Sequence, residues 1–273
     1  MSHLTLTSGV TAGTVFDRLA ARYDSVFTES LIGRAQRNAV WKVLRSTFQH
    51  GDAILELNCG TGEDALFLAS QGMSVFACDA SQQMIAQAEL RVAQQLPIPP
   101  VVFCHLPTER IHELDLAQPF DGVFSNFSGL NCIEDLGAVA SSLSRLVKQG
   151  DPLLLCFSTR ICLMEIVYYA SQGQWGKGLR RCNGSSEAVI DGAPFTVYYP
   201  SLGQIRRCFA PHFRLRSHRG IGVAIPPSYL EPWARRHPHL LKVLCHLEVV
   251  LSVLPFFRAT GDHILLRFEK ITP

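Results

Sequence analysis

The sequence predicts an α/β protein built on a doubly wound, seven-stranded, mostly parallel sheet with an antiparallel last strand. Between residues 53 and 160, short apolar segments alternate with helix-like ones, the pattern of strands paired in parallel through crossover helices. The first apolar segment leads into a turn with Gly60 and Gly62, which opens a helix. Near the chain end a strand, a helical block and a final strand follow one another, which suits a last strand inserted antiparallel.

The elements of the first 160 residues follow from periodicity and from their boundaries. Residues 14–48 are expected to be helical, because apolar residues recur near helical spacing through Val40, Val43 and Leu44. Ser81 is positioned to cap a helix that ends before Pro97. The other elements expected here are strands at 53–57, 74–78, 101–104, 122–125 and 153–157 and helices at 63–70 and 136–148.

The regular alternation stops after Arg160. A hairpin is expected over residues 188–199, because Asp191-Gly192 suits a tight two-residue turn. The remaining expectations are a helix at 162–169, a basic, glycine-rich loop at 177–184, a helix at 201–209, a strand at 213–223, a helical block at 229–254 and a strand at 263–269.

We divide the chain into four segments on this basis. They are an N-terminal helical cap (1–50), a cofactor-binding core (51–160), an insertion (161–200) and the rest of the core (201–273), with a helical lid insertion at about 228–257.

Composition narrows the class of protein. A formal net charge of +2 over 273 residues argues against a nucleic-acid partner. The nine cysteines are scattered, without the spacing of a metal site, and we interpret them as reduced thiols of a cytoplasmic protein. Residues 1–16 lack the pattern of a signal peptide. Residues 240–257 are the most apolar stretch, but charged residues interrupt it, so we expect no membrane span and allow a peripheral membrane contact.

The glycine turn is compatible with two cofactors. Residues 60–65 fit the G-x-G-x-x-A pattern of NAD(P) sites, and Asp79 after the second strand could bind ribose hydroxyls in either case. Glu56 inside the first strand is not a requirement of dinucleotide sites. Roughly 50 residues of mostly helical sequence precede that strand, whereas a dinucleotide domain commonly begins with it.

Four segments resemble the class I S-adenosylmethionine-dependent methyltransferases of the small-molecule group, in family order and spacing. They are ELNCGTG (56–62) for the glycine-rich motif, CDASQQMI (78–85) for the ribose and adenine segment, FDGVFSN (120–126) for the fourth strand, and FDRLAARYD (16–24) for the N-terminal signature. The resemblance covers about residues 14 to 160 and implies a Rossmann-like fold with S-adenosylmethionine as cofactor.

The resemblance also implies roles for individual residues. The backbone of Asn58, Cys59 and Gly60 would contact the methionine part, with Glu56 near its ammonium group, and Gly62 would let the helix approach. The other expected cofactor-binding residues are Asp79 at the ribose, Ala80 and Met84 beside the adenine, Asn126 near the transferring methyl group, Tyr23 covering the cofactor and Arg37 at its carboxylate.

The sequence departs from the family pattern in two places. Asn58 replaces the first glycine of the motif, and asparagine tolerates a positive φ better than most residues. The segment 105–109 lacks the acid that often meets the adenine amino group, so recognition there is expected to use backbone contacts.

The acceptor is less defined than the cofactor. Apolar and aromatic residues after the fifth strand (Tyr198, Tyr199, Tyr229, Trp233 and the 240–257 helix) are expected to cover the site, which suggests a hydrophobic acceptor methylated on oxygen: a phenol, polyketide, quinone-like or lipid compound. His218 and Tyr199 are the candidate bases, and no metal is expected. The alternatives are an NAD(P)-dependent oxidoreductase and a non-catalytic cofactor-binding module on the same fold.

Overall fold

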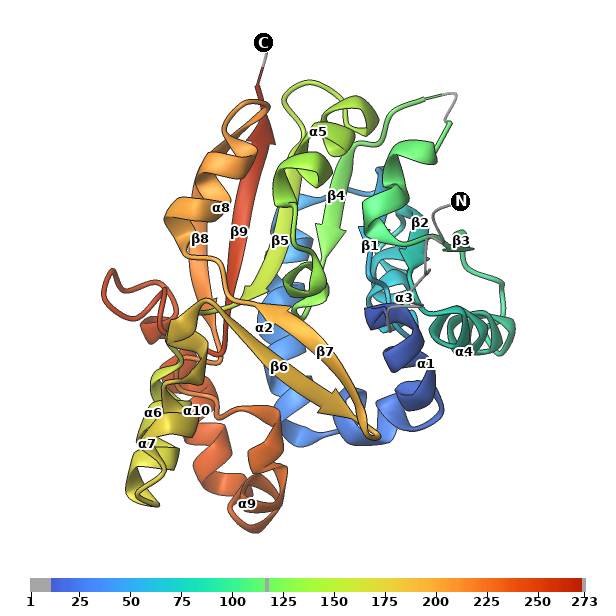
Figure 1. Cartoon of the computed structure of the whole chain (residues 1–273). Helices are drawn as coiled ribbons and strands as arrows, with labels where there is room; N and C mark the ends of the chain where they lie inside the picture. The colour runs from blue at the N-terminus through green and yellow to red at the C-terminus, as the bar shows by residue number, and fades with distance from the viewer. Residues whose placement is uncertain (1–10, 116–117, 272–273) are drawn as a thin grey trace, which may run out of the picture.

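The computed structural model shows one large sheet with helices on both faces (Figure 1) and describes residues 11–115 and 118–271. The strand order is β3-β2-β1-β4-β5-β9-β8. Its strands are β1 (Ala53–Leu57), β2 (Ser74–Asp79), β3 (Val101–His105), β4 (Gly122–Ser125), β5 (Pro152–Ser158), β8 (Phe213–Ile221) and β9 (His263–Lys270). The two halves of the sheet diverge from β1 and β4, and such a reversal point is where α/β sheets bind ligands.

Strand direction confirms the predicted fold class. Strands β1 to β5 pair in parallel, with Leu55 opposite both Phe76 and Val123. Strand β9 is antiparallel to both of its neighbours, β5 and β8. The last strand of the chain is therefore inserted between two earlier ones, as the order of the C-terminal segments predicts.

Two apolar layers hold helices on the sheet. On one face, α5 (Leu136–Leu146) and α8 (Leu202–Phe209) pack against alternate strand residues such as Leu55 and Leu155. On the other face, α2 (Leu31–Thr47), α3 (Glu63–Ser70) and α4 (Gln82–Ala93) pack against the intervening residues, Ile54 and Leu154 among them. This alternation is what the side-chain period of a strand requires.

The N-terminal helical stretch is broken, where the sequence predicts continuous helix from 14 to 48. Helix α1 (Ala12–Tyr23) runs into a π-helical turn (Asp24–Thr28), and α2 begins anew after Ser30. The Ser30 hydroxyl accepts a hydrogen bond from the Gly33 amide at 2.9 Å, which stabilises this second start. Residues 1–10 of the predicted cap, like 116–117 and 272–273, lie outside the described residues.

The segments beyond β5 form a small hairpin and a group of helices. The hairpin of β6 (Ser185–Ile190) and β7 (Ala193–Tyr198) turns at Asp191-Gly192, as predicted. The helices are α6 (Leu163–Ser171), α7 (Trp175–Gly178), α9 (Glu231–Arg236) and α10 (Pro238–Leu251), with short 3₁₀ turns at Arg180–Asn183 (η4) and Ser228–Leu230 (η5). Two further 3₁₀ turns precede β5, at Thr108–Glu113 (η2) and Gly129–Cys132 (η3).

Two of these regions differ from the sequence expectation. The predicted helical block at 229–254 is divided at Pro238, which opens α10, and the predicted loop at 177–184 contains helical turns. In the part of the chain that the structure describes, no helix has both the length and the apolar character needed to cross a bilayer. The division into four segments remains a prediction.

Candidate active site

A cavity of about 420 Å³ lies at the end of the sheet to which the parallel strands point. Its walls come from the turns that follow β1, β2 and β4, from α1 and α2, from η2 and η3, and from β7. Figure 1 shows why these segments meet: α1 lies over one side of this edge, and the β6–β7 hairpin crosses beneath it.

The glycine turn after β1 is held in a left-handed backbone conformation. Asn58 and Gly60 both have φ of 55°, and Gly62 has φ of 78°. Asn58 therefore adopts the positive φ that the sequence predicts for it. A Cβ on Gly62 would lie 2.9 Å from the Phe103 ring and 3.0 Å from the Ala88 methyl, so glycine allows α3 to pack closely against β3 and α4.

Asp79 fixes the next turn through its carboxylate. One oxygen accepts a hydrogen bond from the Gly60 amide at 2.9 Å, and the other accepts one from the Ser81 amide at 2.8 Å. Burial raises the pKa of this carboxyl, while the two amide hydrogen bonds lower it. Asp79 also lines the cavity, so its remaining lone pairs are available to a ligand.

Helix α1 and the π-helical turn close over the glycine turn. Asp24 accepts a hydrogen bond from the Thr61 hydroxyl at 2.7 Å and pairs with Arg91 of α4. The Tyr23 ring lies 4.0 Å from the position of a Cβ on Gly60, and burial raises the pKa of its phenol to about 12. The N-terminal segment is thus tied to both helices that begin at the cavity.

An ion pair forms the base of the cavity. The Arg37 guanidinium lies 2.6 Å from the Asp64 carboxylate, which also accepts hydrogen bonds from Asn126 at 2.9 Å and from Trp41 at 2.6 Å. Arg37 is also 5.0 Å from the centre of the Phe127 ring. This arrangement places one cation and one carboxylate side by side within a largely enclosed space.

Two buried polar atoms near this ion pair have no partner. They are Nε of Arg37 and one carboxylate oxygen of Glu56, which is 1% exposed. Burial raises the pKa of Glu56 well above its ordinary value. The Arg37 side chain lines the cavity, so its unpartnered donor fits a ligand that carries a carboxylate. The residues present therefore fit S-adenosylmethionine, whose methionine part carries one.

One stretch of the cavity wall is apolar. Phe16 of α1 packs edge-to-face on Phe195 of β7, with ring centres 5.7 Å apart, and Val197, Ile133 and Cys132 continue this wall. The hairpin is held to α1 at its tip. Arg18 donates a hydrogen bond to the Asp191 carbonyl at 3.2 Å, and Arg22 pairs with the Asp191 carboxylate.

Most of the predicted cofactor residues line this cavity. Those that do are Tyr23, Arg37, Asn58, Cys59, Gly60, Asp79, Ala80, Met84 and Asn126. Glu56 and Gly62 are not part of the lining; Glu56 is buried in β1, and Gly62 packs against neighbouring helices and strands. Cofactor binding by each of these residues is a prediction from the sequence.

The two candidate bases lie elsewhere. His218 is in β8, and burial together with Arg258 lowers its pKa. Tyr199 is buried after β7, with the Arg181 guanidinium 5.6 Å from its ring centre. Neither residue lines the cavity, so the geometry gives no support to either as a base.

The expected aromatic cover is also absent from the cavity lining, because α10 packs on another surface. Glu231 accepts hydrogen bonds from the Leu31 and Ile32 amides at 2.9 and 3.1 Å, which holds α9 to the start of α2. Helix α10 follows directly, with Leu241 against Ile32. The cavity is covered instead by α1 and the hairpin.

Several lining residues were not singled out from the sequence. Asp64 is the second residue of α3, shortly after the glycine motif, and only the tertiary structure pairs it with Arg37. Phe16 belongs to the quoted N-terminal motif, which was a usable signal. Thr61 and Glu109 lie in the segments 56–62 and 105–109 discussed above, but neither was assigned a role. Other lining residues include Glu63, Arg110, Phe127, Cys132, Ile133, Phe195 and Val197, for which the sequence offered no distinguishing pattern.

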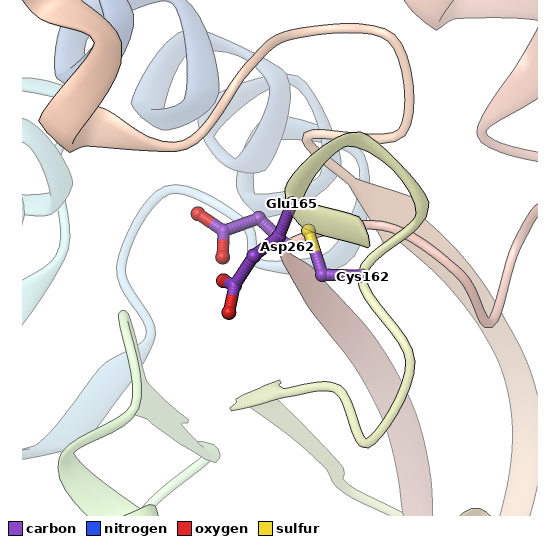
Figure 2. A group of neighbouring side chains, drawn as sticks. All are labelled: Cys162, Glu165 and Asp262. Carbon is purple, nitrogen blue, oxygen red and sulfur yellow. The ribbon is translucent and has the colours of Figure 1, made fainter. Parts of the chain in front are cut away.

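A second cluster of potential ligand atoms lies outside the cavity (Figure 2). The Cys162 sulfur and the Glu165 and Asp262 carboxylates lie within 4.8 Å of one another, and all three residues are buried. Arg181 lies 2.6 Å from the Glu165 carboxylate and 2.8 Å from that of Asp262, and Arg180 is 2.8 Å from Glu165. Arg181 already neutralises both acids, so we interpret the cluster as a buried ion network and not as a metal site. The network connects α6, η4 and the start of β9.

Comparisons with known proteins agree with this geometry. Residues 54–150 match the family model described as a methyltransferase domain. A demethylmenaquinone methyltransferase from Thermobifida fusca is 29% identical over 143 residues, which are 52% of this chain and 58% of that protein. A 2-phytyl-1,4-naphtoquinone methyltransferase from Trichormus variabilis is 29% identical over 143 residues, 49% of this chain and 58% of that protein.

Solved structures extend the similarity to most of the chain. A putative S-adenosylmethionine-dependent methyltransferase from Listeria monocytogenes superposes with a TM-score of 0.56 at 14% identity, over 85% of this chain and 98% of that one. At this identity the likeness concerns the fold. The chain spans a little over half the length of the curated relatives it matches. The segment that matches the family model contains most of β1, all of β2, β3 and β4, and the turn residues Asn58, Gly60 and Asp79.

Proposed function

We propose that this protein transfers the methyl group of S-adenosylmethionine to a hydrophobic small molecule. The premise is that residues 54–150 match a methyltransferase domain and that the chain has the fold of S-adenosylmethionine-dependent methyltransferases. One observation supports this most strongly. A cavity whose polar part is formed by the glycine turn, Asp79 and Arg37 continues into an apolar part formed by Phe16 and Phe195.

In the polar part, each residue would perform a distinct task. Asp79 would accept hydrogen bonds from the ribose hydroxyls, and Ala80 and Met84 would flank the adenine. Arg37 would meet the carboxylate of the methionine part, and Tyr23 would cover the cofactor. When bound, S-adenosylmethionine supplies an electrophilic methyl group on a sulfonium, a good leaving group. The protein has then to align the acceptor and exclude water.

In the apolar part, the lining favours an acceptor with little polar surface. Aromatic and aliphatic side chains gain free energy by burying such a molecule. The two relatives described above are named for quinone-type substrates, so we propose a quinone-like or related phenolic or lipid acceptor for this chain. Methylation on oxygen is the acceptor chemistry that we propose.

The protonation states of the residues that line the cavity restrict which of them could remove a proton from the acceptor. Burial raises the pKa of both the Tyr23 phenol and the Cys132 thiol to about 12, so both are neutral near pH 7. The described residues that line the cavity include no histidine. A proton on the acceptor would therefore pass to a carboxylate of the lining, such as Glu109, or leave an acceptor hydroxyl acidic enough to ionise without a base. We also propose that the protein acts in the cytoplasm and without a nucleic-acid partner.

Substitutions at two aspartates test which cofactor the protein binds. Asp79→Asn replaces an acceptor oxygen by an amide NH₂ that faces a backbone N–H, so S-adenosylhomocysteine should bind at least about tenfold more weakly in calorimetric titration. Asp121→Asn is the matched control, because Asp121 accepts the Ala53 amide at 2.9 Å at the start of β1, away from the cavity. Binding of NADH in place of S-adenosylhomocysteine would overturn the proposal in favour of an oxidoreductase.

Transfer of a labelled methyl group tests the acceptor. The protein is incubated with methyl-labelled S-adenosylmethionine and a panel of hydroquinones, phenols and lipids, with a peptide and a tRNA beside them. We expect label in the apolar aromatic acceptors and loss of that label in Asp79→Asn. Fragmentation of the product assigns the methylated atom, and label confined to peptide or tRNA would refute the acceptor class.

A further inference from the structure

A groove of about 490 Å³ lies between α2, β8 and α10, and in the described part of the chain it shares no lining residue with the candidate active site. Its α10 wall is fixed to the fold. The Glu248 carboxylate, 3% exposed, accepts hydrogen bonds from the amides of Val223 and Ala224 at 3.2 and 2.7 Å. Just beyond the helix, the Ser252 carbonyl accepts one from the Gly220 amide of β8 at 2.8 Å. These bonds hold α10 against β8 and the loop that follows it.

Positive charge enters the groove from all three elements. Arg34 and Lys42 lie on the side of α2 that faces it. Arg219 comes from β8 and Lys242 from α10. Among the described residues, no carboxylate forms an ion pair with any of these four side chains. Like charges around one groove repel one another, and an anion between them would relieve this repulsion.

The other charged residues of the groove have partners within the protein. Glu248 is the one acid among the described lining residues, and backbone amides already occupy its carboxylate oxygens. Arg45 donates a hydrogen bond to the Gln71 side chain at 3.4 Å and lies 4.8 Å from the centre of the Phe67 ring. The four cations from α2, β8 and α10 are therefore the charged groups available to a ligand.

Apolar side chains line the groove between these charges. Ile221, Ile225 and Leu241 are at most 6% exposed. Leu241 of α10 belongs to the same apolar cluster as Ile32 of α2, so this part of the groove is well packed. A surface that combines unpaired cations with buried aliphatic side chains fits a molecule with both an anionic and an apolar group.

We propose that this groove binds a small phosphate ester that carries an alkyl or aryl group. The cations would donate charge-assisted hydrogen bonds to the phosphate oxygens, and the apolar group would lie against Ile225 and Leu241. A phosphate monoester fits better than a carboxylate, because it presents three acceptor oxygens and a charge of about −1.5 to −2 at pH 7 to four cations. Such binding does not depend on methyl transfer.

Calorimetric titration of the full chain with three probes tests the proposed ligand class. Octyl phosphate carries both groups, inorganic phosphate only the anion, and octyl glucoside only the alkyl chain. Below the concentrations at which the octyl compounds form micelles, we expect octyl phosphate to bind at least about tenfold more tightly than either of the others. Absence of octyl phosphate binding, or equal binding of octyl phosphate and one of the other probes, would overturn the proposal.

Substitutions at two of the cations test the location. Lys42→Gln/Arg219→Gln should weaken octyl phosphate binding about tenfold. The matched control is Arg207→Gln/Arg214→Gln, which removes the same charge from α8 and β8 outside both cavities. Equal weakening in both double variants would show diffuse attraction to surface charge and refute the site.

Two further measurements separate this site from other sources of binding. Thermal melting and titration with S-adenosylhomocysteine should match wild type in both double variants, so a failure of the proposed function leaves this test intact. Vesicles of phosphatidylcholine with phosphatidylglycerol provide phosphate at a bilayer surface. Binding to these vesicles without binding of octyl phosphate would assign the cations to a membrane surface and contradict the proposal.

Discussion

The polar and apolar parts of the cavity are built in different ways. The polar part comes from turns that directly follow β1 and β2, where Asp79 accepts the Gly60 amide across adjacent strand ends. The apolar part joins Phe16 of α1 to Phe195 of β7. Helix α1 precedes the first strand of the sheet, and β7 follows β5, so the two elements are far apart in the sequence. Local backbone geometry therefore determines the glycine turn and the position of Asp79, whereas the Arg37–Asp64 pair and the apolar wall depend on the assembly of distant segments.

Gly13→Ala should have the largest effect, because it affects both parts of the cavity. A Cβ at residue 13 would lie 2.3 Å from the Ala80 carbonyl oxygen, so α1 has to move away from the turn after β2. We expect a loss of about 1–3 kcal/mol in the free energy of unfolding and about tenfold weaker binding of S-adenosylhomocysteine. Chemical denaturation and calorimetry measure the two quantities.

Gly203→Ala is the control for this substitution. Gly203 is also helical, in α8, but the nearest atom to an added Cβ lies 4.0 Å away. Here alanine should stabilise the protein by about 0.5–1 kcal/mol through helix propensity alone. A stabilising effect at both positions would show that α1 does not depend on close contact with Ala80.

Phe195→Ala should separate the two parts of the cavity. It removes one ring of the apolar wall and leaves the glycine turn and Asp79 in place, so kcat/KM for an apolar acceptor should fall about tenfold. The affinity for S-adenosylhomocysteine should change by less than about twofold. Phe256→Ala, at an 89% exposed site outside the cavity lining, serves as the control. A loss confined to cofactor affinity would reverse the assignment of the two parts.

His263 provides a smaller, pH-dependent test of the packing behind the cavity residue Phe127. Its ring packs on Phe127, with centres 5.4 Å apart, and burial lowers its pKa. The unfolded chain, with an ordinary histidine pKa of about 6.5, then binds more protons just below that pH. The free energy of unfolding should therefore fall as pH decreases from about 7 to 5.

His263→Gln should reduce this decrease, as followed by denaturation at a series of pH values. Above about pH 7.5, where the histidine is neutral in both states, the variant and wild type should show parallel dependences on pH. Identical slopes between pH 5 and 7 would contradict the role assigned to His263.

Individual helices and strands show which parts of the fold the sequence could predict. The bounds of β1, α3 and β4 agree with the prediction, because short apolar strands, a glycine turn and nearby capping residues leave few alternatives. The break between α1 and α2 was missed, since a π-helical turn has no distinct periodicity. His218 and Tyr199 were proposed from their expected position near the substrate, and such proximity depends on how the C-terminal segments pack.

The sequence by itself determined the sheet, the glycine turn with Asn58 in its left-handed conformation, and the position of Asp79 at the end of β2. These features depend on residues close together in the chain, whose backbone preferences act locally. Only the tertiary structure decided that Asp64 pairs with Arg37, that the hairpin closes on α1, and that α10 turns its aliphatic face outward. Each of these depends on contacts between segments far apart in sequence, which local preferences do not specify.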